Sequence, residues 1–157
     1  MKTIFRHPLE SILCVLISAL SIITFSQVVA RYVFEAPLSW SEELARFLLL
    51  WLAMLSSAYA FKIKSHFALQ FVIKIVPSKI QKLISVLVPL LVIFFLSGFV
   101  FYSIKFVLGV KGHLAPALQI PMEIPYSSSI AGSSLMLYYV LKTFINDIKS
   151  NPPKEKN

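Results

Sequence analysis

The side chains best suited to metal, redox or acid-base chemistry are few in this sequence and lie far apart. The chain has three histidines, His7, His66 and His113, and one cysteine, Cys14. A haem held inside a membrane bundle needs histidines at membrane depth, and dithiol exchange needs paired cysteines. All three histidines lie outside the long apolar stretches of the chain. The sequence therefore predicts no cofactor, no metal site and no enzyme activity.

The acidic residues lie at the ends of the apolar stretches or outside them. A small membrane subunit that couples transport to an ion by itself normally needs an acid, or an unwound helix, near the middle of the bilayer. None of the acids occupies such a position in the sequence, so we expect an accessory or scaffold protein. The seven acids are Glu10, Glu35, Glu42, Glu43, Glu123, Asp147 and Glu155.

The elements that carry these residues are predicted to be transmembrane helices. Apolar residues make up 57% of the chain and charged residues 14%, whereas soluble domains carry about a quarter charged residues. Formal charges are absent from residues 11–30, 47–61, 83–104 and 124–141. About 20 apolar residues span a bilayer, and the second stretch reaches that length if its helix begins near Trp40. We predict an all-α membrane protein with four transmembrane helices, at about 9–34, 40–61, 81–108 and 125–146.

The segment between the second and third predicted spans is too short to cross the bilayer. Gln70 and Lys74 are four residues apart and would share one face of a helix whose other positions are mostly apolar. We therefore predict a short amphipathic helix at about 66–76, which lies flat at the cytoplasmic surface. The whole of residues 1–150 forms one domain in this prediction, and residues 151–157 form a flexible cytoplasmic tail.

The distribution of positive charge predicts the orientation of the chain. Most of the 15 Lys and Arg residues fall in the N-terminal segment, the second connection and the C-terminal tail. Because Lys and Arg concentrate on the cytoplasmic side of membrane proteins, both termini are expected to be cytoplasmic. The net charge of +8 is then explained by topology and contact with anionic lipid, so no nucleic-acid partner is expected.

The first predicted connection, together with the helix ends on either side of it, contains the most distinctive polar residues. Arg31 and Glu35 are four apart and could pair on one helix face, while Gln27 lies one turn deeper and needs a partner within the bilayer. These side chains are either interfacial anchors or contacts to a partner subunit.

The start of the second predicted helix carries a capping pattern. Ser39 is the expected N-cap, and Glu42 stands three residues later, as in a capping box. Arg46 lies within helical reach of both Glu42 and Glu43, and Trp40 suits the aromatic belt at a membrane surface. A helix start with interfacial anchors explains all of these residues; a role in partner docking explains them equally well.

Pairs of small residues four apart predict close helix packing. Ala53 and Ser57 form such a pair in the second helix, and Ser128 and Gly132 form one in the fourth. Because the fourth helix is rich in serine, its hydroxyls could instead line a polar pore. That interpretation makes the chain an autonomous, homo-oligomeric channel or small transporter, and it stays open beside the scaffold interpretation.

Residues 31–66 also carry a family resemblance. They contain Arg-Tyr-Val-Phe at 31–34, Trp-Ser-Glu-Glu-Leu-Ala-Arg at 40–46, a further Trp51, and a Lys-x-Lys exit at 62–64. In this combination the chain resembles the small membrane subunit, often called the Q subunit, of tripartite ATP-independent periplasmic (TRAP) transporters. Two departures are mild, because serines stand at 56–57 and 65 where the family often has glycine.

The resemblance implies a multi-pass protein of the bacterial inner membrane that works as an accessory scaffold subunit. Its expected partners are a large elevator-type membrane subunit, in a heterodimer, and a periplasmic substrate-binding protein. Sodium and the transported organic acid, of the sialic acid or C4-dicarboxylate class, are expected on the large subunit. The candidate interface residues are Arg31, Glu35, Trp40, Glu42, Glu43 and Arg46.

Overall fold

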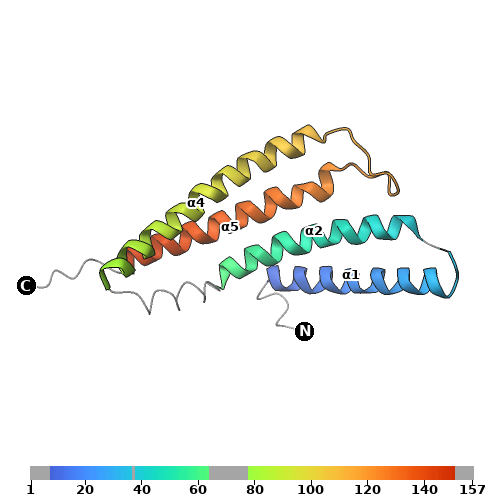
Figure 1. The fold of residues 1–157 in the computed structure, drawn as a ribbon, viewed down its shortest axis with the longest axis horizontal. Coiled ribbons are helices and arrows are strands. Elements are labelled where there is room, and N and C mark those ends of the chain that lie inside the picture. The colour runs from blue at the N-terminus through green and yellow to red at the C-terminus, as the bar shows by residue number, and fades with distance from the viewer. Residues whose placement is uncertain (1–7, 37, 64–77, 151–157) are drawn as a thin grey trace, which may run out of the picture.

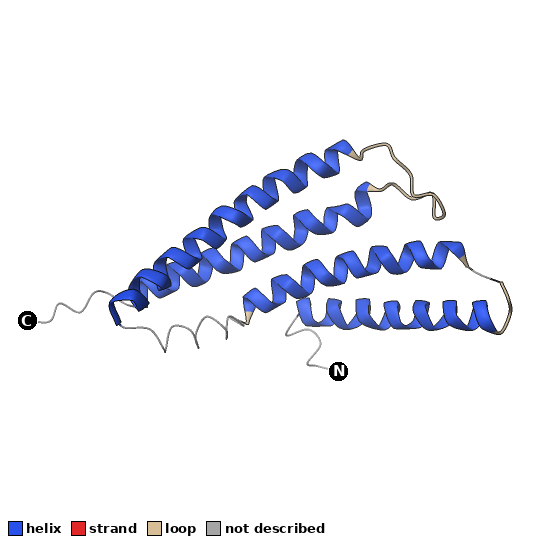
Figure 2. Cartoon of the chain, in the orientation of Figure 1, coloured by secondary structure: helices blue, strands red, loops and turns tan. Residues whose placement is uncertain are grey.

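The structure is a computed structural model, which describes residues 8–36, 38–63 and 78–150. The described chain is helical apart from its connections, as Figure 2 shows. The predicted interfacial helix at about 66–76 and the predicted tail at 151–157 lie outside the described residues. The helices are α1 (Pro8–Tyr32), α2 (Ser39–Lys62), α4 (Ser78–Gly109) and α5 (Glu123–Ser150).

Three of these helices are long and apolar enough to cross a membrane. They are α1, α2 and the Val86–Gly109 part of α4. Proline positions agree with helix geometry at the start of α1 and α5, because Pro8 and Pro125 lie in the first turn, where the missing N–H has no helical partner to lose. Pro89 lies inside α4, where it removes one backbone hydrogen bond.

The four described helices form a single row in the order α1, α2, α5, α4 (Figure 1). Among them, α1 packs along α2, α2 along α5 and α5 along α4, and no other pair of helix backbones comes into contact. Each inner helix therefore has a neighbouring helix on two sides only. The row leaves its two broad faces without a covering layer of helices from the described part of the chain.

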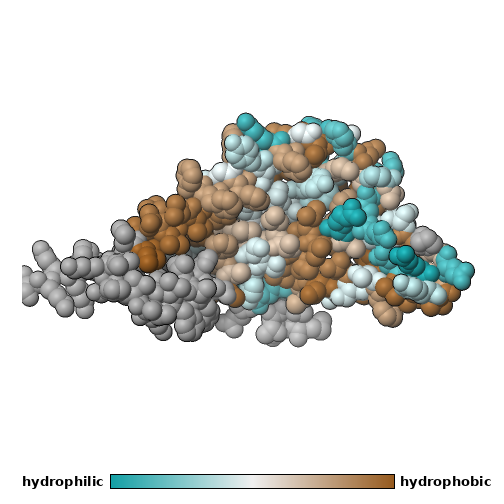
Figure 3. Space-filling model, in the orientation of Figure 1, coloured by the Kyte–Doolittle hydropathy of each residue, from teal (hydrophilic) through white to brown (hydrophobic). Residues whose placement is uncertain are grey.

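The internal core is correspondingly small. Its fully packed members are Ala58 on α2, Leu96 on α4, and Met136 and Val140 on α5. Phe47 and Leu55 of α2 are also buried, but many other large apolar side chains are exposed, and Phe94 on α4 reaches 80% exposure. In α1 no residue is buried at all. Figure 3 shows brown, hydrophobic side chains over much of the surface, as expected for a protein whose solvent is lipid or another membrane subunit.

Helices α2 and α5 approach each other very closely at Gly132. This glycine of α5 is buried, and a Cβ added there would lie 2.7 Å from the Cβ of Met54 and 2.9 Å from its carbonyl oxygen. A glycine is therefore required for these two backbones to reach their observed separation.

Candidate functional site

The polar residues predicted from the sequence gather at one end of the row, where α1 joins α2 and α4 joins α5. We call this the loop end. Hydrophilic side chains are concentrated toward it in Figure 3. All six candidate interface residues lie at or near this end: Arg31, Glu35, Trp40, Glu42, Glu43 and Arg46.

Glu43 holds the connection between α4 and α5 against the start of α2. Its Oε2 atom accepts the backbone N–H of Ala117 at 2.9 Å and that of Leu118 at 2.8 Å. Hydrogen bonds to an ionised acceptor are about twice as strong as bonds between neutral groups. One carboxylate therefore fixes a segment 74 and 75 residues away in the chain.

The connection that Glu43 holds is itself tightly folded. The N–H of Ala115 donates to Ile120 O at 2.9 Å, and the N–H of Gln119 donates to Ala115 O at 2.9 Å. Leu114 and Pro121 form an isolated antiparallel bridge, and Ala115 is fully buried. The segment 115–120 is therefore a compact loop, which we call the clasped loop.

A second glutamate secures the base of this connection. The Glu123 carboxylate, in the first turn of α5, accepts the N–H of Gly112 at 3.4 Å. Gly112 has φ +84°, a left-handed conformation that glycine adopts without steric penalty. The two ends of the connection are thus tied by side-chain and backbone bonds together.

Glu42 joins α2 to α1. Its Oε1 atom accepts a hydrogen bond from Gln27 Nε2 at 3.2 Å. The sequence predicts that Gln27 lies within the bilayer and needs a partner, and the partner is this glutamate. The adjacent acids of α2 therefore have different tasks, because Glu42 faces α1 while Glu43 faces the clasped loop.

The Gln27–Glu42 contact leads to a prediction of modest size. Gln27→Met keeps the length of the side chain and removes its donor, so the free energy of unfolding in detergent is expected to fall by about 0.5–1.5 kcal/mol. A double-mutant cycle with Glu42→Ala isolates the pair. Ser26→Ala, next along the same helix and exposed, is the matched control. A coupling energy near zero would show that this bond contributes nothing.

Two local predictions about this region are wrong. The helix N-cap is Leu38, with no side-chain capping bond, so Ser39 and Glu42 form no capping box. The buried Ser41 hydroxyl instead donates to Leu38 O at 2.7 Å. Helix α1 ends at Tyr32 and Glu35 has φ +49°, so the helical spacing that would pair Glu35 with Arg31 does not exist.

The remaining candidates are open to the surroundings. Trp40 is 43% exposed, and Arg31, Glu35 and Arg46 are also exposed. Within the residues that the structure describes, no ion pair involves either arginine or Glu35. The local neutralisation of Arg46 by the two neighbouring glutamates, expected from helical spacing, is therefore not formed.

The two predicted packing pairs have different surroundings. Ser128 and Gly132 are buried on α5, at the contact with α2. Ala53 and Ser57 are exposed, and the Ser57 hydroxyl donates to Ala53 O at 2.8 Å. The α2 face that meets α5 carries Met54 and the fully buried Ala58, one residue further along the helix in each case.

One polar group of contacts was missed by sequence reasoning. At the end of the row opposite the loop end, Tyr59 Oη donates to Glu10 Oε1 at 3.1 Å, and Lys62 Nζ lies 3.9 Å from the same oxygen. The lysine also lies over the Tyr59 ring, 5.5 Å from its centroid. Together with Gln27–Glu42, these contacts join α1 to α2 near both ends. The sequence did offer one signal for these contacts. Because α1 and α2 are consecutive helices joined by a short connection, the start of α1 is expected to lie beside the end of α2.

Comparison with known proteins gives a consistent result. Residues 20–150 match the family described as tripartite ATP-independent periplasmic transporters, DctQ component. A putative TRAP transporter small permease protein of Haemophilus influenzae strain Rd is 29% identical over 146 residues, which cover 92% of this chain and 90% of that protein.

Two further relatives match over shorter regions. The sialic acid TRAP transporter permease protein SiaT of Haemophilus influenzae strain 86-028NP is 35% identical over 53% of this chain, and the match covers only 14% of SiaT. The C4-dicarboxylate TRAP transporter small permease protein DctQ of Vibrio cholerae is 26% identical over 47% of this chain and 32% of its own length.

Proposed function

Because this chain belongs to the DctQ component family of TRAP transporters, we propose that it is the accessory scaffold subunit of one such transporter. In this proposal it pairs with a large elevator-type membrane subunit and helps to receive a periplasmic substrate-binding protein. The observation that carries the proposal is the match to a small permease protein over 92% of this chain.

The arrangement of the helices supports a role beside a partner. The single row leaves many large apolar side chains exposed, and its end helix, α1, has no buried residue. A partner subunit packed along one face would bury apolar side chains that the described chain leaves open. The moving part of an elevator needs a stationary support, and a wider support resists tilting in the bilayer; this step is an analogy with the family.

The membrane topology is also part of the proposal. Helix α5 is the fourth span beside the three helices of clear transmembrane character, and both termini are cytoplasmic in the inner membrane. The loop end then faces the periplasm. The clasped loop and the exposed Trp40, Arg31 and Glu35 become the surface available to the large subunit or the binding protein.

The transported molecule is proposed to be an organic acid, moved with sodium by the large subunit. Relatives named for sialic acid and for C4-dicarboxylate support the class and do not separate its members. The autonomous channel has less support. Three of the serine hydroxyls that could have lined a pore, those of Ser127, Ser129 and Ser133, donate to backbone oxygens of α5 itself.

The test is an affinity purification of this chain from its native membrane in mild detergent, followed by intact-mass analysis. The expected result is stoichiometric recovery of one much larger polytopic membrane protein. Recovery of the chain alone, as a homo-oligomer that conducts ions or solutes in liposomes, would contradict the scaffold role and restore the channel interpretation.

A further inference from the structure

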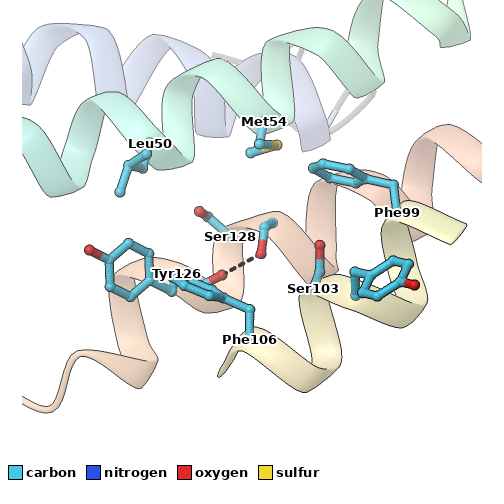
Figure 4. A pocket seen from close by; sticks show the side chains of 9 residues that line it. Leu50, Met54, Phe99, Ser103, Phe106, Tyr126 and Ser128 are labelled. Carbon is cyan, nitrogen blue, oxygen red and sulfur yellow. Dashed lines mark hydrogen bonds between the residues drawn. The ribbon is translucent and has the colours of Figure 1, made fainter. Parts of the chain in front are cut away.

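A cavity lies between α2, α4 and α5 toward the loop end. Its volume is about 270 Å³, and Leu50 and Met54 of α2, Phe99 and Phe106 of α4, and Tyr126 of α5 contribute to its walls (Figure 4). The backbones of α2 and α4 both contact α5 but not each other, which leaves a space between them. Residues of all three helices line the cavity in this space. Pockets that enclose a whole small molecule hold about 300–1,000 Å³. At about 270 Å³ this cavity is smaller than such a pocket, so it could hold one part of a longer molecule.

Two serine hydroxyls open onto this cavity, and neither has a hydrogen-bond partner among the residues that the structure describes. Ser103 of α4 is 6% exposed and Ser128 of α5 is 2% exposed, and neither donates a bond in the structure. Figure 4 shows both oxygens turned into the cavity, while Ser129 donates to the Tyr126 carbonyl at 2.7 Å. A hydroxyl without a partner is destabilising in apolar surroundings, particularly at membrane depth, where water is scarce. An occupant with hydrogen-bond acceptors would satisfy both groups.

A positive charge stands just beyond the cavity on the side of the loop end. Arg46 precedes Leu50 by four residues and Met54 by eight, so the three share one face of α2, with Arg46 nearest the loop end. Arg46 is exposed and forms no ion pair with any residue that the structure describes. A guanidinium in this position is suited to bind a phosphate group.

We propose that this cavity binds a membrane phospholipid. The order of the groups from the loop end inward carries the proposal. Arg46 comes first, Ser103 and Ser128 lie deeper, within a turn of Phe106 and Tyr126, and Met54 and Phe99 line the deepest part. A phospholipid presents the complementary order of phosphate, ester carbonyls and acyl chain. Arg46 binds the phosphate, Ser103 and Ser128 donate to ester carbonyl oxygens, and the first part of one acyl chain fills the cavity. The proposal requires a membrane location and does not depend on the subunit role.

The test is native mass spectrometry of the purified full-length protein, together with whatever copurifies, after washing in mild detergent and titration with a defined phosphatidylglycerol or phosphatidylethanolamine. Ser103→Ala combined with Ser128→Ala is expected to weaken retention of the bound lipid by about threefold or more per hydroxyl. Arg46→Gln is expected to weaken it by about tenfold, because a bond to a charged group is lost. Ser97→Ala and Ser134→Ala, exposed serines on the same two helices, are matched controls.

A folding defect and a lost ligand give different results here. Removing an unpartnered hydroxyl takes away a desolvation penalty, so the delipidated double alanine variant is expected to unfold at or above the wild-type temperature. Equal lipid retention by wild type, the double variant and Arg46→Gln would overturn the proposal. A Ser128→Leu variant, whose larger side chain fills part of the cavity, gives a second test. If this variant retained lipid normally but no longer recovered a partner membrane protein, the proposal would also be overturned, because the occupant of the cavity would then be a protein side chain.

Discussion

Replacing Glu43 with alanine is expected to release the clasped loop from α2. The two backbone N–H groups of Ala117 and Leu118 would lose their charged acceptor, and the free energy of local opening should fall by about 2–3 kcal/mol. Glu43→Gln keeps an acceptor oxygen without its charge, so about half of that loss is expected. The variants therefore separate the contribution of the charge from that of the hydrogen bond.

Amide hydrogen exchange measures this effect at the residues concerned. Exchange at Ala117 and Leu118 should accelerate by at least about tenfold in Glu43→Ala, since about 1.4 kcal/mol corresponds to a factor of ten. Glu35→Ala removes an exposed carboxylate that forms no ion pair within the described residues, and it should leave these amides unchanged. If the clasped loop is part of the docking surface, partner recovery should also fall in Glu43→Ala alone. Unchanged exchange in that variant would show that the loop keeps its fold without the carboxylate.

Substitution of Gly132 is expected to destabilise the whole fold rather than one loop. Even an alanine Cβ would lie 2.7 Å from Met54 Cβ and 2.9 Å from its carbonyl oxygen, so the two helix backbones must move apart. Overpacking of this kind typically lowers the free energy of unfolding by about 1–3 kcal/mol, and Gly132→Val should exceed Gly132→Ala. Loss of contact between α2 and α5 would separate the row into two halves.

Gly98 provides the control for this prediction. It lies inside α4, and an added Cβ would meet nothing within 4 Å. Gly98→Ala should therefore be neutral or stabilising by up to about 1 kcal/mol, as expected for alanine in a helix. Thermal unfolding of both variants in the same detergent compares them directly. Equal melting temperatures for Gly132→Ala and Gly98→Ala would mean that α2 and α5 can separate without loss of stability.

Composition and local spacing were sufficient to predict the helices and the family. Charge-free stretches indicated the helices, and the lone cysteine and scattered histidines argued against redox chemistry. The Arg-Tyr and Trp-Ser-Glu-Glu motifs identified the family, which the match over residues 20–150 confirms. These signals depend only on residues that are close in the chain or on the composition of a whole segment.

The contacts between segments could not be predicted in the same way. Spacing placed Glu43 at a helix start, but its bonds to Ala117 and Leu118 depend on how a distant loop folds. Similarly, the spacing of Ala53 and Ser57 predicted one packing face of α2, but the position of α5 selects a different face, which carries Met54 and Ala58. The capping box failed because the helix begins one residue earlier than predicted: Ser39 is already helical, and the N-cap is Leu38, whose side chain has no oxygen to accept a backbone N–H.

The arrangement of the helices in a row also determines how many lipids the protein contacts. In the proposed topology of four spans, with neighbouring helix axes about 10 Å apart, the row outlines a strip with a perimeter of about 100 Å in the bilayer plane, whereas a two-by-two square of the same helices would have about 80 Å. More boundary lipids therefore contact each residue of the strip than would contact each residue of a square bundle. A partner along one long side would remove about 40 Å of that boundary at once, so lipid release would accompany assembly on this edge more than it could for a square bundle.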